Sequence, residues 1–164
     1  MLLYYLQGLE IINYNKIYKY METENIEKKK TTFNVEEFNR FVTENKSFLD
    51  SNVKVGVFAV GVLIRFLFDI QQANLNNTPF ENKLRGYKLN PELLKYVYIE
   101  ALAKIEAYQS FYVYEDLRQI INRYFIVNSN KLNALSNNEL SFYFVAGLEL
   151  GKTFKHEKEK INNQ

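Results

Sequence analysis

The chain contains no cysteine and no tryptophan, and it has a single histidine among its 164 residues. Without cysteine there is no disulfide framework and no thiolate chemistry, and this composition is typical of a cytoplasmic protein. The histidine, His156, lies in the charged C-terminal segment, where a solvated side chain is more frequent than a metal ligand or a catalytic base. We therefore expect no catalytic residue, no bound metal and no cofactor.

The motifs of common catalytic and phosphate-binding sites are also missing. Glu115 and Asp116 are adjacent, so their side chains point to different faces of a helix. Gly147 and Gly151 lie inside an apolar segment, where packing is a more frequent role than anion binding. The sequence predicts a protein that is not an enzyme. The alternative is a hydrolase whose site is assembled across several helices, and it would be marked by carboxylates with perturbed pKa values in a pocket.

Long hydrophobic runs are absent as well. The longest uncharged apolar run, residues 55–64, is bounded by Lys54 and Arg65, whereas a membrane-spanning helix needs about 20 predominantly apolar residues. The N-terminal residues lack the basic region and the cleavage site of a signal peptide. We expect a soluble protein without a membrane partner.

Helix signals follow one another along the chain. Residues 53–70 and 135–152 are apolar on almost all sides, and their glycines allow other backbones to come close. Ser136, with Glu139 three residues later, has the spacing of a capping box. No segment alternates apolar and polar residues as a strand does. We predict an all-α fold: a compact helical bundle of about five to seven helices, more than about 60% helical and without a sheet.

The expected helices cover residues 34–49, 53–73, 79–84, 91–108, 113–124 and 136–160. Asn34 and Asn90 are the caps of two of them. We expect an N-terminal helix and a polar linker in residues 1–33, and the helical bundle in residues 34–164. Residues 53–73 and 140–154 should be the most buried, and Arg65 should pair with Asp69 one turn away.

The basic residues are the candidates for ligand binding, although a net charge of +2 alone gives no strong case for a nucleic-acid partner. Lys83, Arg85 and Lys88 fall in one short segment, with Tyr87 among them and no acid. Such a segment can hold a phosphate backbone and stack a base. The alternative is a solvated turn.

A second group of candidates lies on the polar face of the helix expected at 113–124. Arg118, Asn122 and Arg123 are about one turn apart there. Besides binding phosphate, these side chains could pair with Glu115 or with an acidic neighbouring helix, and the sequence leaves both roles open.

The last helix is apolar on more than one face. Tyr143, Phe144, Leu148 and Gly151 face one way, and Phe142, Val145 and Ala146 another. A helix that is apolar nearly all round needs protein on every side. Part of this surface should therefore contact a second copy or a neighbouring subunit; the alternative is complete burial within the monomer.

Four stretches carry a resemblance to a known family. They are residues 57–63 with Ile70-Gln71, Pro79-Phe80 with residues 83–89, residues 94–108, and residues 135–154. In these stretches the chain, from about residue 48 to residue 154, resembles the C-terminal region of the large subunit of type I-B CRISPR effector complexes (Cascade). That region is also produced as a free small subunit from an internal start, for which Met1 and Met21 are both candidates.

The resemblance implies a non-catalytic small subunit of an RNA-guided surveillance complex in antiviral defence. It would stabilise target DNA and the R-loop by sequence-independent backbone contacts. Its partners would be the type I-B large subunit, the backbone subunits, the guide RNA, the target DNA and further copies of itself. The nucleic-acid-binding residues would be Lys83, Arg85, Lys88, Arg118, Asn122 and Arg123.

The alternative function is a helical protein–protein adaptor that does not bind nucleic acid. Cations gathered on one face would favour nucleic acid, whereas scattered cations and an exposed apolar patch would favour the adaptor.

Overall fold

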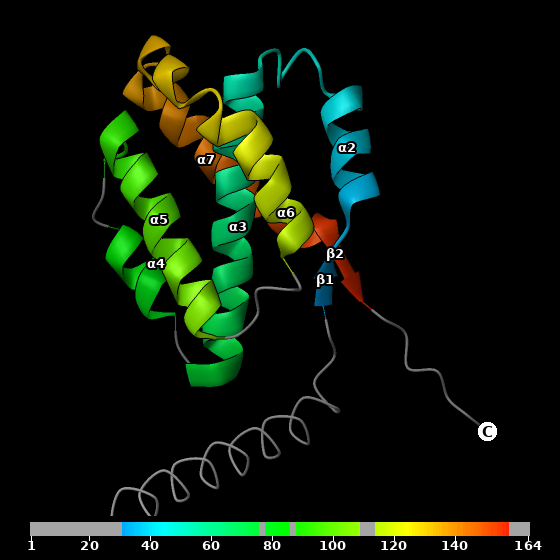
Figure 1. Ribbon diagram of the computed structural model, residues 1–164, viewed down its shortest axis with the longest axis vertical. Coiled ribbons are helices and arrows are strands. Elements are labelled where there is room, and N and C mark those ends of the chain that lie inside the picture. The colour runs from blue at the N-terminus through cyan, green and yellow to red at the C-terminus, as the bar shows by residue number, and fades with distance from the viewer. Residues whose placement is uncertain (1–30, 76–77, 86–87, 109–113, 158–164) are drawn as a thin grey trace, which may run out of the picture. The chain divides into compact units, whose positions relative to one another are not determined.

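The computed structural model describes residues 31–75, 78–85, 88–108 and 114–157. The N-terminal helix expected in residues 1–33 lies outside them, as does its polar linker apart from the last three residues. Residues Thr31–His156 form one compact unit, shown in Figure 1. Its helices are α2 (Val35–Glu44), α3 (Asn52–Leu75), α4 (Pro79–Leu84), α5 (Pro91–Ala107), α6 (Glu115–Ile121) and α7 (Asn137–Leu150).

Shorter elements connect these helices. A π-helix, Asn122–Ile126, continues α6, and 3-10 helices form at Ser129–Ala134 and Gly151–Phe154. The described residues contain two strands, β1 (Thr31–Phe33) and β2 (Lys155–Glu157), which pair with each other. The predicted all-α helical bundle is confirmed. The two strands were not expected, because three residues are too few to show an alternating pattern.

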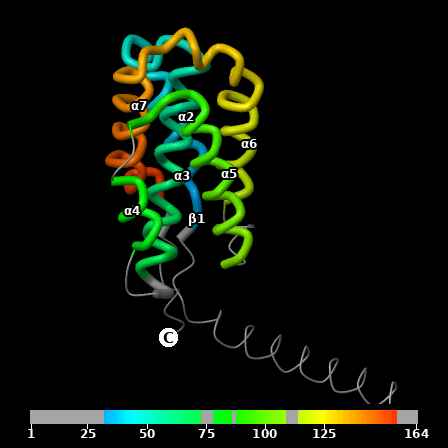
Figure 2. Tube along the Cα trace, turned by 90° about the vertical axis from the view of Figure 1, so that its left-hand side faces the viewer, coloured from blue at the N-terminus to red at the C-terminus, as the bar shows by residue number. Residues whose placement is uncertain are grey.

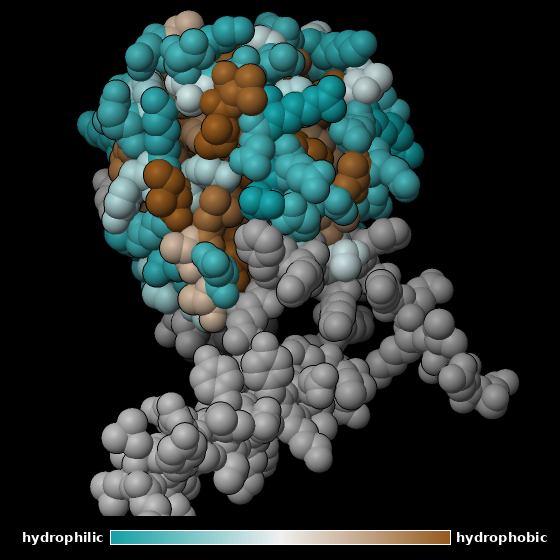
Figure 3. All heavy atoms as spheres, in the orientation of Figure 1, coloured by the Kyte–Doolittle hydropathy of each residue, from teal (hydrophilic) through white to brown (hydrophobic). Residues whose placement is uncertain are grey.

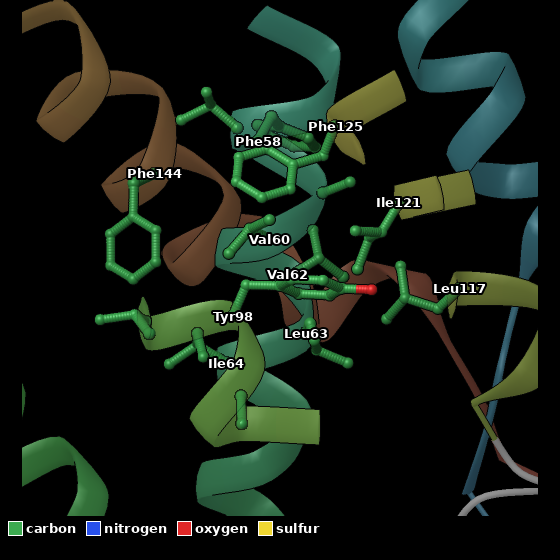
Figure 4. Packing of buried hydrophobic residues seen from close by; sticks show 14 of the residues in the cluster. Phe58, Val60, Val62, Leu63, Ile64, Tyr98, Leu117, Ile121, Phe125 and Phe144 are labelled. Carbon is green, nitrogen blue, oxygen red and sulfur yellow. The ribbon is translucent and has the colours of Figure 1, made fainter. Parts of the chain in front are cut away.

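Helix α3 lies at the centre and contacts α4, α5, α6 and α7 (Figure 1). Its apolar side chains are almost completely buried on all sides, as the sequence predicted. Figure 4 shows Val60 and Leu63 of α3 among Tyr98 of α5, Ile121 of α6 and Phe125 of the π-helix. None of the helices in the described ranges is long and apolar enough to cross a membrane.

Helices α3 and α7 touch through their backbones. A Cβ atom on Gly61 of α3 would lie 2.1 Å from the carbonyl oxygen of Phe144, and one on Gly147 of α7 would lie 2.0 Å from the carbonyl oxygen of Phe58. Neither distance leaves room for a methyl group. The two glycines are therefore what allows α7 to lie directly on the central helix, as the sequence predicted.

Helix α7 ends about ten residues earlier than expected. It stops at Leu150, and the Gly151–Phe154 turn directs the ring of Phe154 into the core, within 5.3 Å of Phe38 and 5.5 Å of Phe41, measured between ring centres. The backbone N–H of Asn34 donates to the Phe154 carbonyl at 2.8 Å. A straight helix would lose both contacts, so the prediction of a helix to residue 160 was wrong.

Caps fix the starts of three helices where the sequence placed them. The Ser136 N–H donates to Glu139 Oε2 at 2.8 Å, and the Glu139 N–H donates to Ser136 Oγ at 3.2 Å, which completes the capping box. Asn34 and Asn90 each accept from the N–H three residues later. Buried Gln71 of α3 accepts from the Phe80 N–H at 3.1 Å, a cap supplied from another helix.

The expected ion pair between Arg65 and Asp69 is wrong, although both side chains are engaged. Arg65 Nε donates to the Leu148 carbonyl at 2.9 Å, and its Nη2 lies 3.8 Å from Glu149 Oε1. Asp69 pairs instead with Lys155, the first residue of β2. Because α7 packs on α3, Arg65 contacts α7 instead of forming a pair with Asp69 within its own helix.

Substituting Gly61 by alanine tests the α3–α7 contact. In an ordinary helix this change is favourable by about 1 kcal/mol. Here we expect a loss of about 3 kcal/mol in the free energy of unfolding, because the new methyl group meets the Phe144 carbonyl. Chemical denaturation measures the change. Ala103→Gly, at an exposed position of α5, is the control and should cost about 1 kcal/mol. A stabilised Gly61→Ala protein would contradict the close contact.

A charge placed in α3 should unfold the domain. Val60 is fully buried, and an isolated carboxylate there has no partner to offset its desolvation. We expect Val60→Asp to abolish the cooperative thermal transition seen by circular dichroism. Val145→Asp places the same charge at an exposed position of α7 and should retain the transition. A folded Val60→Asp protein would refute the central position of α3.

Candidate nucleic-acid interface

The first candidate group lies at α4 and the residues after it. Lys83 Nζ is 2.8 Å from Glu100 Oε1 on α5 and 5.5 Å from the ring centre of Tyr96. Arg85, directly after α4, has its Nη2 3.1 Å from Glu81 Oε1 of that helix. Lys88 is exposed, and no ion pair links it to a described residue. Tyr87, expected to stack on a base, lies outside the described residues.

The second group lies on α6 and the π-helix. Arg118 donates from Nε and Nη2 to both carboxylate oxygens of Glu115, at 2.9 and 2.7 Å. This is the local pairing that the sequence left open. Asn122 accepts a hydrogen bond from the Tyr98 hydroxyl at 3.4 Å, and the guanidinium of Arg123 lies 5.5 Å from the ring centre of Tyr124.

The perturbed carboxylates of this region reflect surface pairing. Hydrogen bonds from Thr78 and Arg85 hold the pKa of Glu81 below its usual value of 4.5. The hydrogen bond from Arg118 lowers the pKa of Glu115 in the same way. Both carboxylates are charged at neutral pH, and the pairs are lost only as the pH falls through the lowered pKa values. In the described ranges, no three metal-ligating side chains come together.

The two groups do not share one face. Lys83 reaches α5 at Glu100, whereas Asn122 reaches it at Tyr98. Residues two positions apart on a helix point about 200° away from each other, so the groups lie on opposite sides of α5. Figures 1 and 2 agree, since α5 lies between α4 and α6 in both views. The structure thus brings Lys83 near Arg85, and Arg118 near Asn122, without joining the two groups.

Exposed apolar side chains lie on α5, on the π-helix and on α7. The sequence predicted such a surface only on α7. Figure 3 shows brown apolar patches over α5 and over the π-helix within a hydrophilic surface. Tyr96 and Ile99 of α5 are 51% and 64% exposed. The sequence did not indicate this, because the apolar stripe on the opposite face of α5 predicted a helix that packs on the core. On α7, Phe142 is 59% and Val145 49% exposed, while Tyr143 and Phe144 are buried. The prediction that residues 140–154 are among the most buried therefore holds for only one side of α7.

A comparison with known protein families finds a match. A family model described as the C-terminal domain of CRISPR-associated protein TM1802 (cas_TM1802) matches residues 1–162. The match extends at both ends beyond residues 48–154, which carried the resemblance seen in the sequence, and includes the N-terminal residues. Neither the curated proteins nor the solved structures contain a significant match.

Removing the carboxylate that pairs with lysines should strengthen polyanion binding. Glu100 lies 2.8 Å from Lys83 Nζ and 3.9 Å from Lys104 Nζ. We expect Glu100→Gln to bind heparin more tightly and with a steeper salt dependence, because Lys83 and Lys104 no longer pair with this carboxylate. Glu106→Gln changes the net charge equally at an exposed carboxylate without an ion pair to a described residue. Equal salt slopes for the two variants would show that the pairs do not compete with phosphate.

Proposed function

The chain belongs to the C-terminal domain family of CRISPR-associated protein TM1802, and on this basis we propose that it is a non-catalytic small subunit of a CRISPR RNA-guided effector complex. Family membership assigns it a role in a CRISPR system and is the observation that carries the proposal. The type I-B large subunit, the backbone subunits, the guide RNA and the target DNA are its proposed partners. A role in stabilising target DNA within the R-loop follows from the resemblance in the sequence.

A non-catalytic role is supported by how the acidic residues are used. The carboxylates with lowered pKa values, Glu81, Glu115 and Glu139, accept hydrogen bonds from basic side chains or from a helix cap. A general acid or base requires a pKa near neutral pH, and these shifts go in the opposite direction. These three glutamates therefore form surface ion pairs or cap a helix.

The DNA contact in this proposal is sequence-independent and weak. Lys88 and Arg123 are exposed without an ion pair to a described residue, and they are the first candidates for phosphate contacts. Lys83, Arg85 and Arg118 must exchange a glutamate for a phosphate. Exposed ion pairs contribute only about 0–1 kcal/mol, so the exchange costs little. A few such contacts give dissociation constants on the order of 10⁻⁴–10⁻⁶ M at physiological salt, and the DNA grip then depends on neighbouring subunits.

A second candidate function, the adaptor that binds proteins only, is favoured by two observations. The cations lie on opposite sides of α5, and Phe142 and Val145 form an exposed apolar face on α7. A single bundle does not cover this face, so in both functions we assign it to a contact with a neighbouring subunit or a further copy. The two functions differ in whether the cations matter for DNA binding.

Charge reversal separates the two functions. We expect a complex containing Lys88→Glu and Arg123→Glu to assemble normally but to bind target DNA more weakly, equally for unrelated sequences. The salt slope should flatten by about one unit per lost contact. Lys83→Glu, Arg85→Glu and Lys88→Glu together should show the same pattern. Titration of the purified complex with labelled duplexes at several salt concentrations measures both effects.

The matched control for the double variant is Lys46→Glu with Lys152→Glu. Both lysines are exposed and form no ion pair with a described residue, so the change in net charge is the same. If the double variant and this control bind DNA like the unmodified complex, the DNA-binding role is wrong and the adaptor stands.

A further inference from the structure

One face of α5 is uncovered and has the spacing of a helix-pairing stripe. Its members recur at intervals of four, three, four and three residues, and all are exposed. They are Glu92, Tyr96, Ile99, Ala103 and Glu106. We call these five residues the α5 seam. Alternating intervals of three and four keep side chains on one line along a helix, which is how one helix packs against another.

The α5 seam lies on the side of the helix that faces away from the core. The buried residues of α5 include Val97, Ala101 and Ile105, which face the centre of the bundle. At about 100° per residue, the seam is centred nearly opposite to them. It is thus a second apolar stripe on a helix whose first stripe already serves the fold.

The charges of the α5 seam are arranged symmetrically. Glu92 and Glu106 close the stripe at its two ends, 14 positions or about 21 Å apart along the helix. Both are exposed and neither forms an ion pair with a described residue. Between them lie Tyr96, Ile99 and the small side chain of Ala103, which permits a close approach.

This arrangement disfavours a second copy and nucleic acid as occupants. If two copies paired in antiparallel orientation, Glu92 would face Glu106 of the other copy; in parallel orientation, each glutamate would face its equivalent. Like charges in register are destabilising in either case. A phosphate backbone along the seam would meet a glutamate at each end, and Lys83, 5.5 Å from the Tyr96 ring, is already paired with Glu100.

We propose that the α5 seam binds one amphipathic helix of another protein subunit. That helix carries apolar residues at three- and four-residue intervals and a lysine or arginine towards each end, opposite Glu92 and Glu106. The inference rests on the proposed function only in placing the chain within a complex. It adds the partner's chemistry and a docking surface distinct from the Phe142 and Val145 face of α7.

A cross-link from the seam centre identifies the occupant. Because the chain has no cysteine, Ile99→Cys provides a single attachment site for a maleimide-benzophenone probe. The labelled chain is assembled into the effector complex, irradiated, and analysed by mass spectrometry. We expect a cross-link to a segment of another protein subunit with the apolar spacing and basic ends described above. The control is Val127→Cys, at a position 74% exposed outside the seam.

Four results would overturn the proposal: a cross-link to nucleic acid, to a second copy, or within the same chain, or no cross-link above that of the Val127→Cys control.

Charge reversal gives an independent test. Glu92→Lys with Glu106→Lys should reduce the cross-link yield about tenfold, because both ends of the seam would then repel the basic residues of the partner helix. The same reversal at Glu36 and Glu44, both exposed on α2, should leave it unchanged. Equal yields from the two double variants would refute the charge pairing.

Assembly assays separate this inference from the proposed function. We expect Ile99→Glu to lower the amount of chain retained in the purified complex about tenfold, while the isolated chain keeps its melting temperature because Ile99 is exposed. If Ile99→Glu is retained like the unmodified chain and the complex binds target DNA, the seam is refuted and the proposed function stands. An unmodified chain that joins no complex refutes both.

Discussion

The close contact between α3 and α7 is the constraint on which the rest of the structure depends. Gly61 and Gly147 let the two backbones touch, so no side chain separates the central helix from the helix that it contacts most extensively. Once α7 is held there, the turn after Leu150 directs Phe154 to α2, and Arg65 meets the end of α7. The first and last described segments are thus fixed by one helix pair.

A cluster of aromatic rings joins α3 to α2 and to the segment after α7. Phe58 of α3 lies within 6.0 Å of Phe38 and Phe154 and stacks on Phe41 at 5.4 Å, measured between ring centres. Tilted and edge-to-face aromatic pairs stabilise more than their buried area alone. The cluster joins residues more than 110 positions apart, and it explains how two three-residue strands can pair at the edge of a helical bundle.

The described surface has exposed apolar helix faces, which favour protein contacts, but no continuous basic face of the kind that binds a nucleic-acid backbone. Its candidate cations are divided by α5, and Lys83, Arg85 and Arg118 already have glutamate partners. Its apolar side chains, in contrast, line up on exposed helix faces. This division agrees with the proposed role, in which other proteins position the chain and it adds a few phosphate contacts of its own.

The sequence by itself predicted the main helices, three of their caps and the two glycines at the α3–α7 contact, but not where α7 ends. Capping and helical periodicity are local, so Ser136 with Glu139 and the start at Asn90 were predictable from their neighbours. The candidate cations were also visible, but not their partners. Only the tertiary structure placed Glu100 beside Lys83, gave Asp69 to Lys155 and left Ile99 uncovered. These contacts join residues 17 or more positions apart, or depend on which neighbours cover a face, and no local pattern encodes how helices pack.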